Sequence, residues 1–92
     1  MSLKSGVREG LVGRFIEARR EKIGMSRAEL TAKIGCSQNL VGMIERGKIR
    51  FPFRRWLIYA DALGVPRLEF LRIAVEEKFP EMLPYLICRE AD

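Results

Sequence analysis

Two short helical segments joined by a two-residue link constrain the fold of this chain more than any other feature. Ser26 is a good N-cap residue, and Glu29 three positions later completes a capping box that begins the first segment. Ser37 begins the second segment as another N-cap residue, and only Gly35 and Cys36 lie between the two. A link this short predicts a sharp corner between the helices rather than an antiparallel pair.

The apolar positions around this corner have the spacing of two packed helices. One pair on the first segment lies four residues apart, one pair on the second lies three apart, and a small apolar residue lies in the link. We expect the inner side of the corner to consist of Leu30, Ile34, Cys36, Val41 and Ile44. The pattern predicts a helix-turn-helix whose second helix is held out from the body, able to enter the major groove of DNA.

Helical spacing, divided by glycine and proline, also accounts for the rest of the chain, and no sustained strand pattern is present. Pro80 and Pro84 leave room only for a short last helix. The apolar stripes of the longer helices include Ile23, Leu57 and Leu68. The helices are expected over about residues 10–23, 26–34, 37–46, 52–63, 66–75 and 82–89.

The predicted organisation is therefore all-α, with one helical domain in the middle of the chain. A flexible segment is expected over residues 1–9, a helix-turn-helix domain over 10–75, and an extension over 76–92 that is a candidate dimerisation element. The stretch from Phe79 to Ile87 is apolar and surplus to a five-helix core. It is expected to pack either back on Trp56 and Tyr59 or on a second subunit.

Charge is distributed unevenly along the chain, whose net charge is +5. Residues 1–55 carry 13 Lys and Arg against 5 Asp and Glu, and residues 56–92 carry 4 against 7. A basic half and an acidic half predict one surface that faces a polyanion and one that faces something else. The alternative is a solvated surface with a chance asymmetry.

Several classes of protein are disfavoured by composition. The chain has no histidine, the commonest general acid or base, and only two cysteines, Cys36 and Cys88, which form no CxxC pair. We therefore expect no metal site, no cofactor and no enzymatic activity. No stretch approaches the roughly 18 apolar residues of a membrane span, and the N-terminus lacks the pattern of a signal peptide, so a cytoplasmic location is expected.

The stretch from Ser26 to Gly47, SRAELTAKIGCSQNLVGMIERG, resembles the phage-repressor/Cro-type (Xre) helix-turn-helix family. The likeness covers about residues 12–71 and includes ADALGV at 60–65 and EFL at 69–71. The resemblance implies a five-helix, lambda-repressor-like DNA-binding domain, here with a short extra C-terminal helix. It also implies binding to operator DNA, usually as a two-fold dimer.

Two positions depart from the family pattern. Arg27 stands where the family usually has a glutamine that touches the DNA backbone and braces the helix that reads the bases. Thr31 stands where alanine is preferred, at the close approach of the two helices. An arginine can hold a phosphate but braces differently, and a threonine is expected to open the crossing slightly.

The first turn of the second helix is expected to face base edges. The amides of Gln38 and Asn39 can pair with adenine N6 and N7, and the resemblance places base-reading residues at these positions. Ser37 either caps its helix or contacts DNA. Leu40 and Met43 are expected on the outer side, where they either meet thymine methyl groups or are simply exposed.

Charged residues complete the predicted site. Arg20 and Glu45 each fall on an apolar helix face, and because a lone charge against a core is costly, the two are expected to pair. The resemblance supports this pairing. The phosphate-binding candidates lie near helix starts and in a basic loop, and are Arg27, Arg46, Lys48, Arg50, Arg54 and Arg55.

Together these features predict a sequence-specific regulator of transcription that binds double-stranded DNA. A repressor that acts as a homodimer is favoured, because a palindromic operator needs a two-fold protein. The alternative is a protein–protein interaction module that uses the same fold, with Gln38 and Asn39 merely solvated.

Overall fold

The computed structural model describes residues 10–87 of the chain. These residues contain six α-helices and two short 3₁₀ turns, and no strand occurs among them. The helices are α2 (Leu11–Lys22), α3 (Arg27–Ile34), α4 (Gln38–Glu45), α5 (Trp56–Leu63), α6 (Arg67–Lys78) and α7 (Leu83–Ile87). The turns are η1 (Phe53–Arg55) and η2 (Pro80–Met82). The predicted all-α class is confirmed; the expected segment 1–9, Cys88 and the end of the expected last helix lie outside the described residues.

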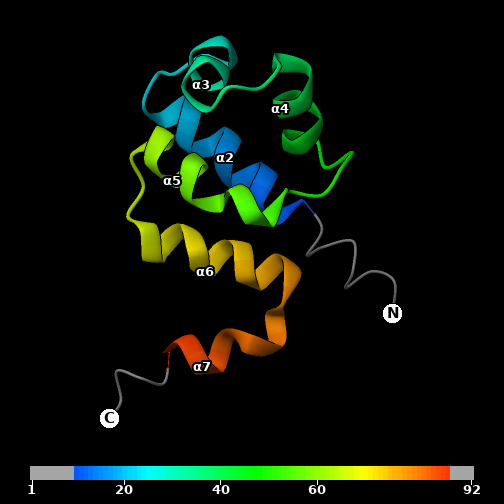
Figure 1. Ribbon diagram of the computed structural model, residues 1–92, viewed down its shortest axis with the longest axis vertical. Coiled ribbons are helices and arrows are strands. Elements are labelled where there is room, and N and C mark those ends of the chain that lie inside the picture. Colours follow the sequence, from blue (N-terminus) through cyan, green and yellow to red (C-terminus); the bar gives the residue numbers. More distant parts are fainter. Residues whose placement is uncertain (1–9, 88–92) are drawn as a thin grey trace.

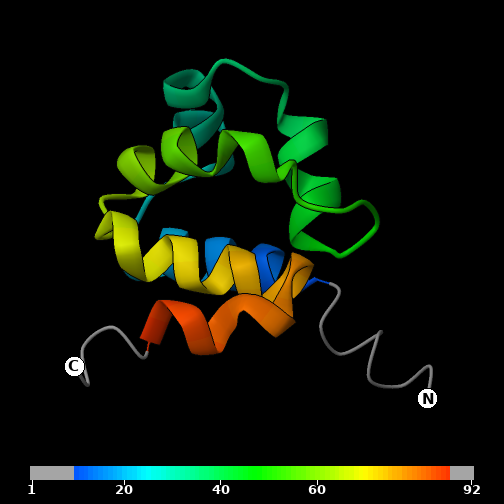
Figure 2. The same ribbon diagram turned by 60° about the horizontal axis from the view of Figure 1, so that its bottom comes forward.

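The helices are arranged along one long axis (Figure 1). The corner of α3 and α4 lies at one end, α2 and α5 lie below it, and α6 crosses below them. The chain then turns back through η2, so that α7 packs on the side of α6 that faces away from the corner (Figure 2). None of the described helices is both long and apolar enough to cross a membrane.

An aromatic cluster lies at the centre of the core. The ring of Phe51 contacts Tyr59 and Phe70 edge-on, with centroids 5.0 and 5.7 Å apart. Tyr59 is only 1% exposed within this cluster. Phe79 packs on Phe53, with ring centroids 5.6 Å apart. The described part of the extension thus contacts the domain at η1, as well as through its packing on α6.

Three residues of the predicted apolar stripes are not in the core. Ile23 is 41% exposed because it is the C-cap of α2, beyond the last buried turn. Leu57 is 38% exposed because Tyr59, Ala60 and Leu63 form the buried side of α5. Leu68 is 59% exposed in the first turn of α6, where its neighbour Arg67 pairs at the surface with Asp61.

The fourth predicted helix is interrupted at its start. Pro52 has an extended backbone, with φ −73° and ψ 95°, and the chain passes through η1 before α5 begins at Trp56. The fifth helix is longer than expected, because α6 continues to Lys78 without a break at residue 76. Glu77 near its end accepts a 2.8 Å hydrogen bond from the backbone N–H of Val12. This carboxylate satisfies one of the unpaired amides at the start of α2.

Candidate nucleic-acid interface

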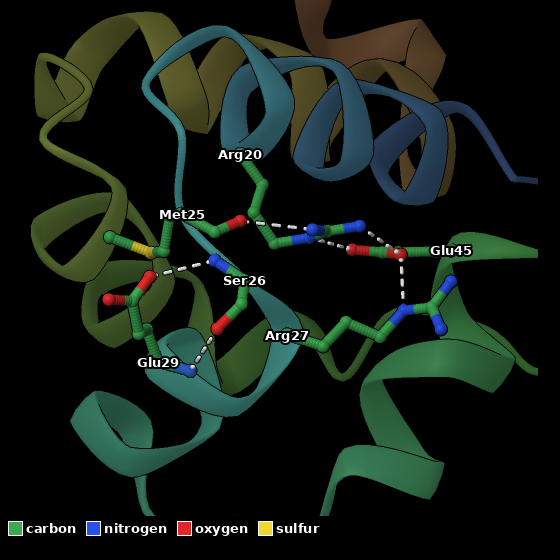
Figure 3. Close-up of polar contacts among 6 residues, drawn as sticks. All are labelled: Arg20, Met25, Ser26, Arg27, Glu29 and Glu45. Atoms are coloured by element: carbon green, nitrogen blue, oxygen red, sulfur yellow. Dashed lines mark hydrogen bonds and ion pairs between the residues drawn. The ribbon is translucent and has the colours of Figure 1, made fainter.

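The corner between α3 and α4 is built by local capping bonds. The hydroxyl of Ser26 accepts a bond from the N–H of Glu29 at 3.0 Å, and the Glu29 carboxylate accepts one from the N–H of Ser26 at 2.8 Å (Figure 3). Gly35 ends α3 in the left-handed conformation, with φ 75°. The Ser37 hydroxyl accepts a 3.1 Å bond from the N–H of Leu40 and so acts as the N-cap of α4. The predicted corner and both caps are therefore present.

The inner side of α4 lies against the backbone of α2. A Cβ added to Gly13 would overlap the carbonyl oxygen of Ile44 and lie 2.8 Å from its carbonyl carbon. Only a glycine allows the two helices to approach this closely. Val41 and Ile44, both at most 1% exposed, fill the space on either side of the contact. The position of α4 relative to the body is thus set by backbone contact as well as by side-chain packing.

A buried carboxylate at the end of α4 is held by two arginines (Figure 3). Arg20 donates from Nε to Oε2 of Glu45 at 2.9 Å and from Nη2 to Oε1 at 3.1 Å. Its Nη1 donates to the carbonyl of Met25 at 3.0 Å. The side chain of Glu45 is fully buried, and its hydrogen bonds and charge raise the pKa of Arg20. The structure thus brings together the two charges that the helical spacing placed on apolar faces.

Arg27 joins the same carboxylate from α3, which sequence reasoning did not foresee. Its Nε donates to Oε1 of Glu45 at 2.9 Å, and its side chain is 37% exposed. The first residue of α3 therefore braces the last residue of α4, and α2, α3 and α4 all meet at one group. The only signal for this contact was the resemblance, which marks position 27 as one that braces the base-reading helix.

Gln38 and Asn39 are both exposed in the first turn of α4. Met43 is half-buried one turn further along. Leu40 differs from expectation: it is half-buried and packs against the core. It lies one turn before Ile44 and therefore on nearly the same face of the helix. We call α4 the reading helix from here on, after the role that the sequence predicts for it.

The other predicted phosphate-binding residues follow the reading helix along the chain. Arg46 is its C-cap, Lys48 and Arg50 lie in the following loop, and Arg54 lies in η1; all four are exposed. Arg55 is exposed as well, and its Nη2 donates to the carbonyl of Ile34 at 3.2 Å. It thereby satisfies a carbonyl at the C-terminal end of α3.

The link residue Cys36 is half-buried and packs against the core beneath the corner. Its Sγ donates to the carbonyl of Ser37 at 3.7 Å. Burial, and then the neighbouring thiol of Cys36, raise the pKa of Tyr59, so the phenol below the corner stays neutral. Within residues 10–87 no three Cys, Asp or Glu side chains are grouped as metal ligands.

A family described as a helix-turn-helix domain matches residues 11–72, from the start of α2 to the middle of α6. No curated protein and no solved structure matches the chain. The matched residues include both caps of the corner, the contact of Gly13 with α4, and the pair of Arg20 and Glu45. The chain belongs to this helix-turn-helix domain family, in the phage-repressor/Cro-type (Xre) group.

Proposed function

We propose that this protein is a sequence-specific regulator of transcription that binds a palindromic operator as a homodimer and represses from it. The observation that carries the proposal is the contrast between the two sides of the reading helix. Its inner side is locked against α2 through Gly13 and through the buried Glu45. Its first turn holds the amides of Gln38 and Asn39 in solvent. A rigid helix with exposed amides suits readout in the major groove.

Base recognition is assigned to the exposed side chains of the reading helix. Gln38 and Asn39 can each donate to adenine N7 and accept from N6, and Met43 is placed to meet a thymine methyl group. Ser37 uses its oxygen as a cap, but its own O–H can still donate to a phosphate. Leu40 has a packing role instead, because it contacts the core.

Phosphate binding is assigned to the cations beside the reading helix. Lys48, Arg50 and Arg54 follow it along the chain, and Arg27 lies at the start of α3 with part of its side chain exposed. These residues belong to the basic half of the chain. If four of them per protomer bind phosphate, the log-log salt slope of a dimer is about −7, at ~0.9 per phosphate.

The experiment that tests the function is selection of bound sequences from a pool of random duplexes. The wild type is compared with the double variant Gln38→Ala/Asn39→Ala and with a control, Arg72→Ala, which removes an exposed charge from α6. We expect the wild type and the control to enrich the same palindrome and the double variant to lose or relax it. Weak, salt-sensitive binding without enrichment in the wild type would contradict the proposal.

The spacing of the selected half-sites reports which surface joins the protomers. The helix α7 lies at the opposite end of the long axis from the reading helix (Figure 1). Half-sites about one helical turn apart, roughly 34–36 Å, require contact close to the reading helix. Half-sites two or more turns apart fit a contact through the C-terminal extension. Sedimentation of the protein with the selected duplex then measures the stoichiometry directly.

A protein–protein interaction module is the second candidate. It is favoured by the exposed apolar side chains of the C-terminal extension, since Tyr85 is 74% exposed and Met82 is 47% exposed. This candidate predicts no sequence enrichment for the wild type, and it predicts that the Gln38→Ala/Asn39→Ala variant behaves as the wild type does in every DNA-binding assay.

A further inference from the structure

The side chain of Arg46 folds back along the reading helix instead of extending from its end. A Cβ added to Gly42 would lie 3.4 Å from Nη1, 3.6 Å from Nη2 and 3.8 Å from Cζ of Arg46. Since three atoms of a planar group lie at similar distances from one point, the guanidinium covers the position of the missing side chain. Gly42 therefore provides the surface on which the guanidinium of Arg46 rests.

This position continues the row of amides along the reading helix. Gly42 follows Gln38 by four residues and Asn39 by three, so it lies on the same side of the helix one turn later. Four residues of helix advance about 6 Å, which is close to two base-pair steps of about 3.4 Å. A guanidinium above Gly42 thus addresses a base pair about two steps from the one that Gln38 faces.

The guanidinium is available for a ligand. Arg20, Arg27 and Arg55 are each bonded to a protein acceptor. Arg46 is exposed, and among the described residues it has neither a hydrogen-bond nor an ion-pair partner. An arginine fork that faces the floor of the major groove matches O6 and N7 of guanine, the commonest specific contact of this kind.

We propose that Arg46 determines specificity by reading a guanine from its position against the reading helix, above Gly42. The proposal rests on the proposed function, and it changes the role of Arg46 from one phosphate contact among several to a base-reading contact. It predicts a G·C pair at one position in each half-site, about two base pairs from the adenine that Gln38 addresses.

The test is selection and competition binding with Arg46→Ala, with Lys48→Ala as the matched control. Both variants remove one exposed cation next to the reading helix. We expect Arg46→Ala to lose the preference for G·C at the one position, where the wild type discriminates by roughly 5- to 150-fold. Lys48→Ala is expected to weaken all sequences alike and to reduce the salt slope by about 0.9 per protomer, while the selected sequence stays the same.

A second variant separates the reading contact from folding. Gly42→Ala places a Cβ 3.4 Å from Nη1 of Arg46, at an ordinary contact distance from a flexible side chain. Because alanine favours a helix interior over glycine, its Tm is expected to match or exceed that of the wild type, while discrimination for G·C stays because the guanidinium can keep its position. The proposal is overturned if Arg46→Ala selects the wild-type sequence at every position with only weaker affinity. If the wild type itself selects no sequence, the proposed function fails instead.

Discussion

Removal of Arg20 tests whether the buried charge cluster holds the reading helix in place. In the Arg20→Ala variant the carboxylate of Glu45, whose side chain is fully buried, loses two hydrogen bonds and keeps only the one from Arg27. The carbonyl of Met25 loses its partner as well. In Arg27→Ala, by contrast, both bonds from Arg20 remain. The two variants therefore remove unequal parts of the same cluster.

The expected magnitudes follow from burial. Breaking a buried ion pair by removing one partner costs about 3–5 kcal/mol, and Arg20 is 11% exposed. The side chain of Arg27 is 37% exposed and leaves a satisfied pair behind, so its removal is expected to cost about 1 kcal/mol. The whole domain is stable by about 5–14 kcal/mol at the usual 0.05–0.15 kcal/mol per residue. Arg20→Ala thus removes a large fraction of the stability, and Arg27→Ala a small one.

Urea and thermal unfolding followed by circular dichroism measure the difference. We expect a fall in Tm of roughly 12 °C or more for Arg20→Ala and roughly 4–8 °C for Arg27→Ala, at 4–8 °C per kcal/mol for a domain of this size. Asp61→Asn is the control, because it breaks an ion pair with Arg67 at the surface and is expected to leave Tm unchanged. Equal losses for the two arginine variants, or no loss for Arg20→Ala, would refute the reasoning.

Two further predictions concern the core. Gly13→Ala forces α2 and α4 apart, at an overpacking cost of about 1–3 kcal/mol against a gain of about 1 kcal/mol in helix propensity. A lower midpoint of unfolding in urea is therefore expected. An unchanged or higher midpoint would show that the helices can separate freely. The raised pKa of Tyr59 means that the folded state holds the phenolic proton more tightly than the unfolded state. The contribution of this group to folding stability is therefore complete below the pKa of tyrosine in the unfolded chain, near 10, and is lost as the pH rises above it. Thermal unfolding between pH 8 and 12 is expected to show a steeper loss for the wild type than for Tyr59→Phe, and parallel curves would contradict the assignment.

The features that the sequence predicted well are those with local causes. The caps at Ser26 and Ser37 and the turn at Gly35 each depend on residues within four positions of one another. The pair of Arg20 and Glu45 was predictable over a longer distance, because each charge interrupted an otherwise apolar face and a buried charge needs a partner.

The features that the sequence missed depend on how distant elements pack. Ile23, Leu57 and Leu68 have helical spacing, but no local property shows that α5 turns Tyr59 inward or that the buried side of α2 ends at Arg20. The bond between Glu77 and Val12 joins residues 65 positions apart, and neither residue is unusual in its own segment. The fold of Arg46 over Gly42 was also hidden, because a surface arginine has no preferred direction until its neighbours are placed.

The place of Glu45 predicts that the charge cluster affects recognition as well as stability. A carboxylate at the C-terminal end of a helix is opposed by the helix dipole, so Glu45 is tolerated there only with cations beside it. Those cations come from α2 and from the first residue of α3, and they therefore determine the angle between the two helices of the corner. Loss of Arg27 leaves the core intact but frees α3 from the end of the reading helix. We therefore expect Arg27→Ala to relax base preference at the positions assigned to Gln38 and Asn39 by more than its small cost in stability implies. A uniform loss of affinity with unchanged base preference would instead show that Arg27 acts on phosphate alone.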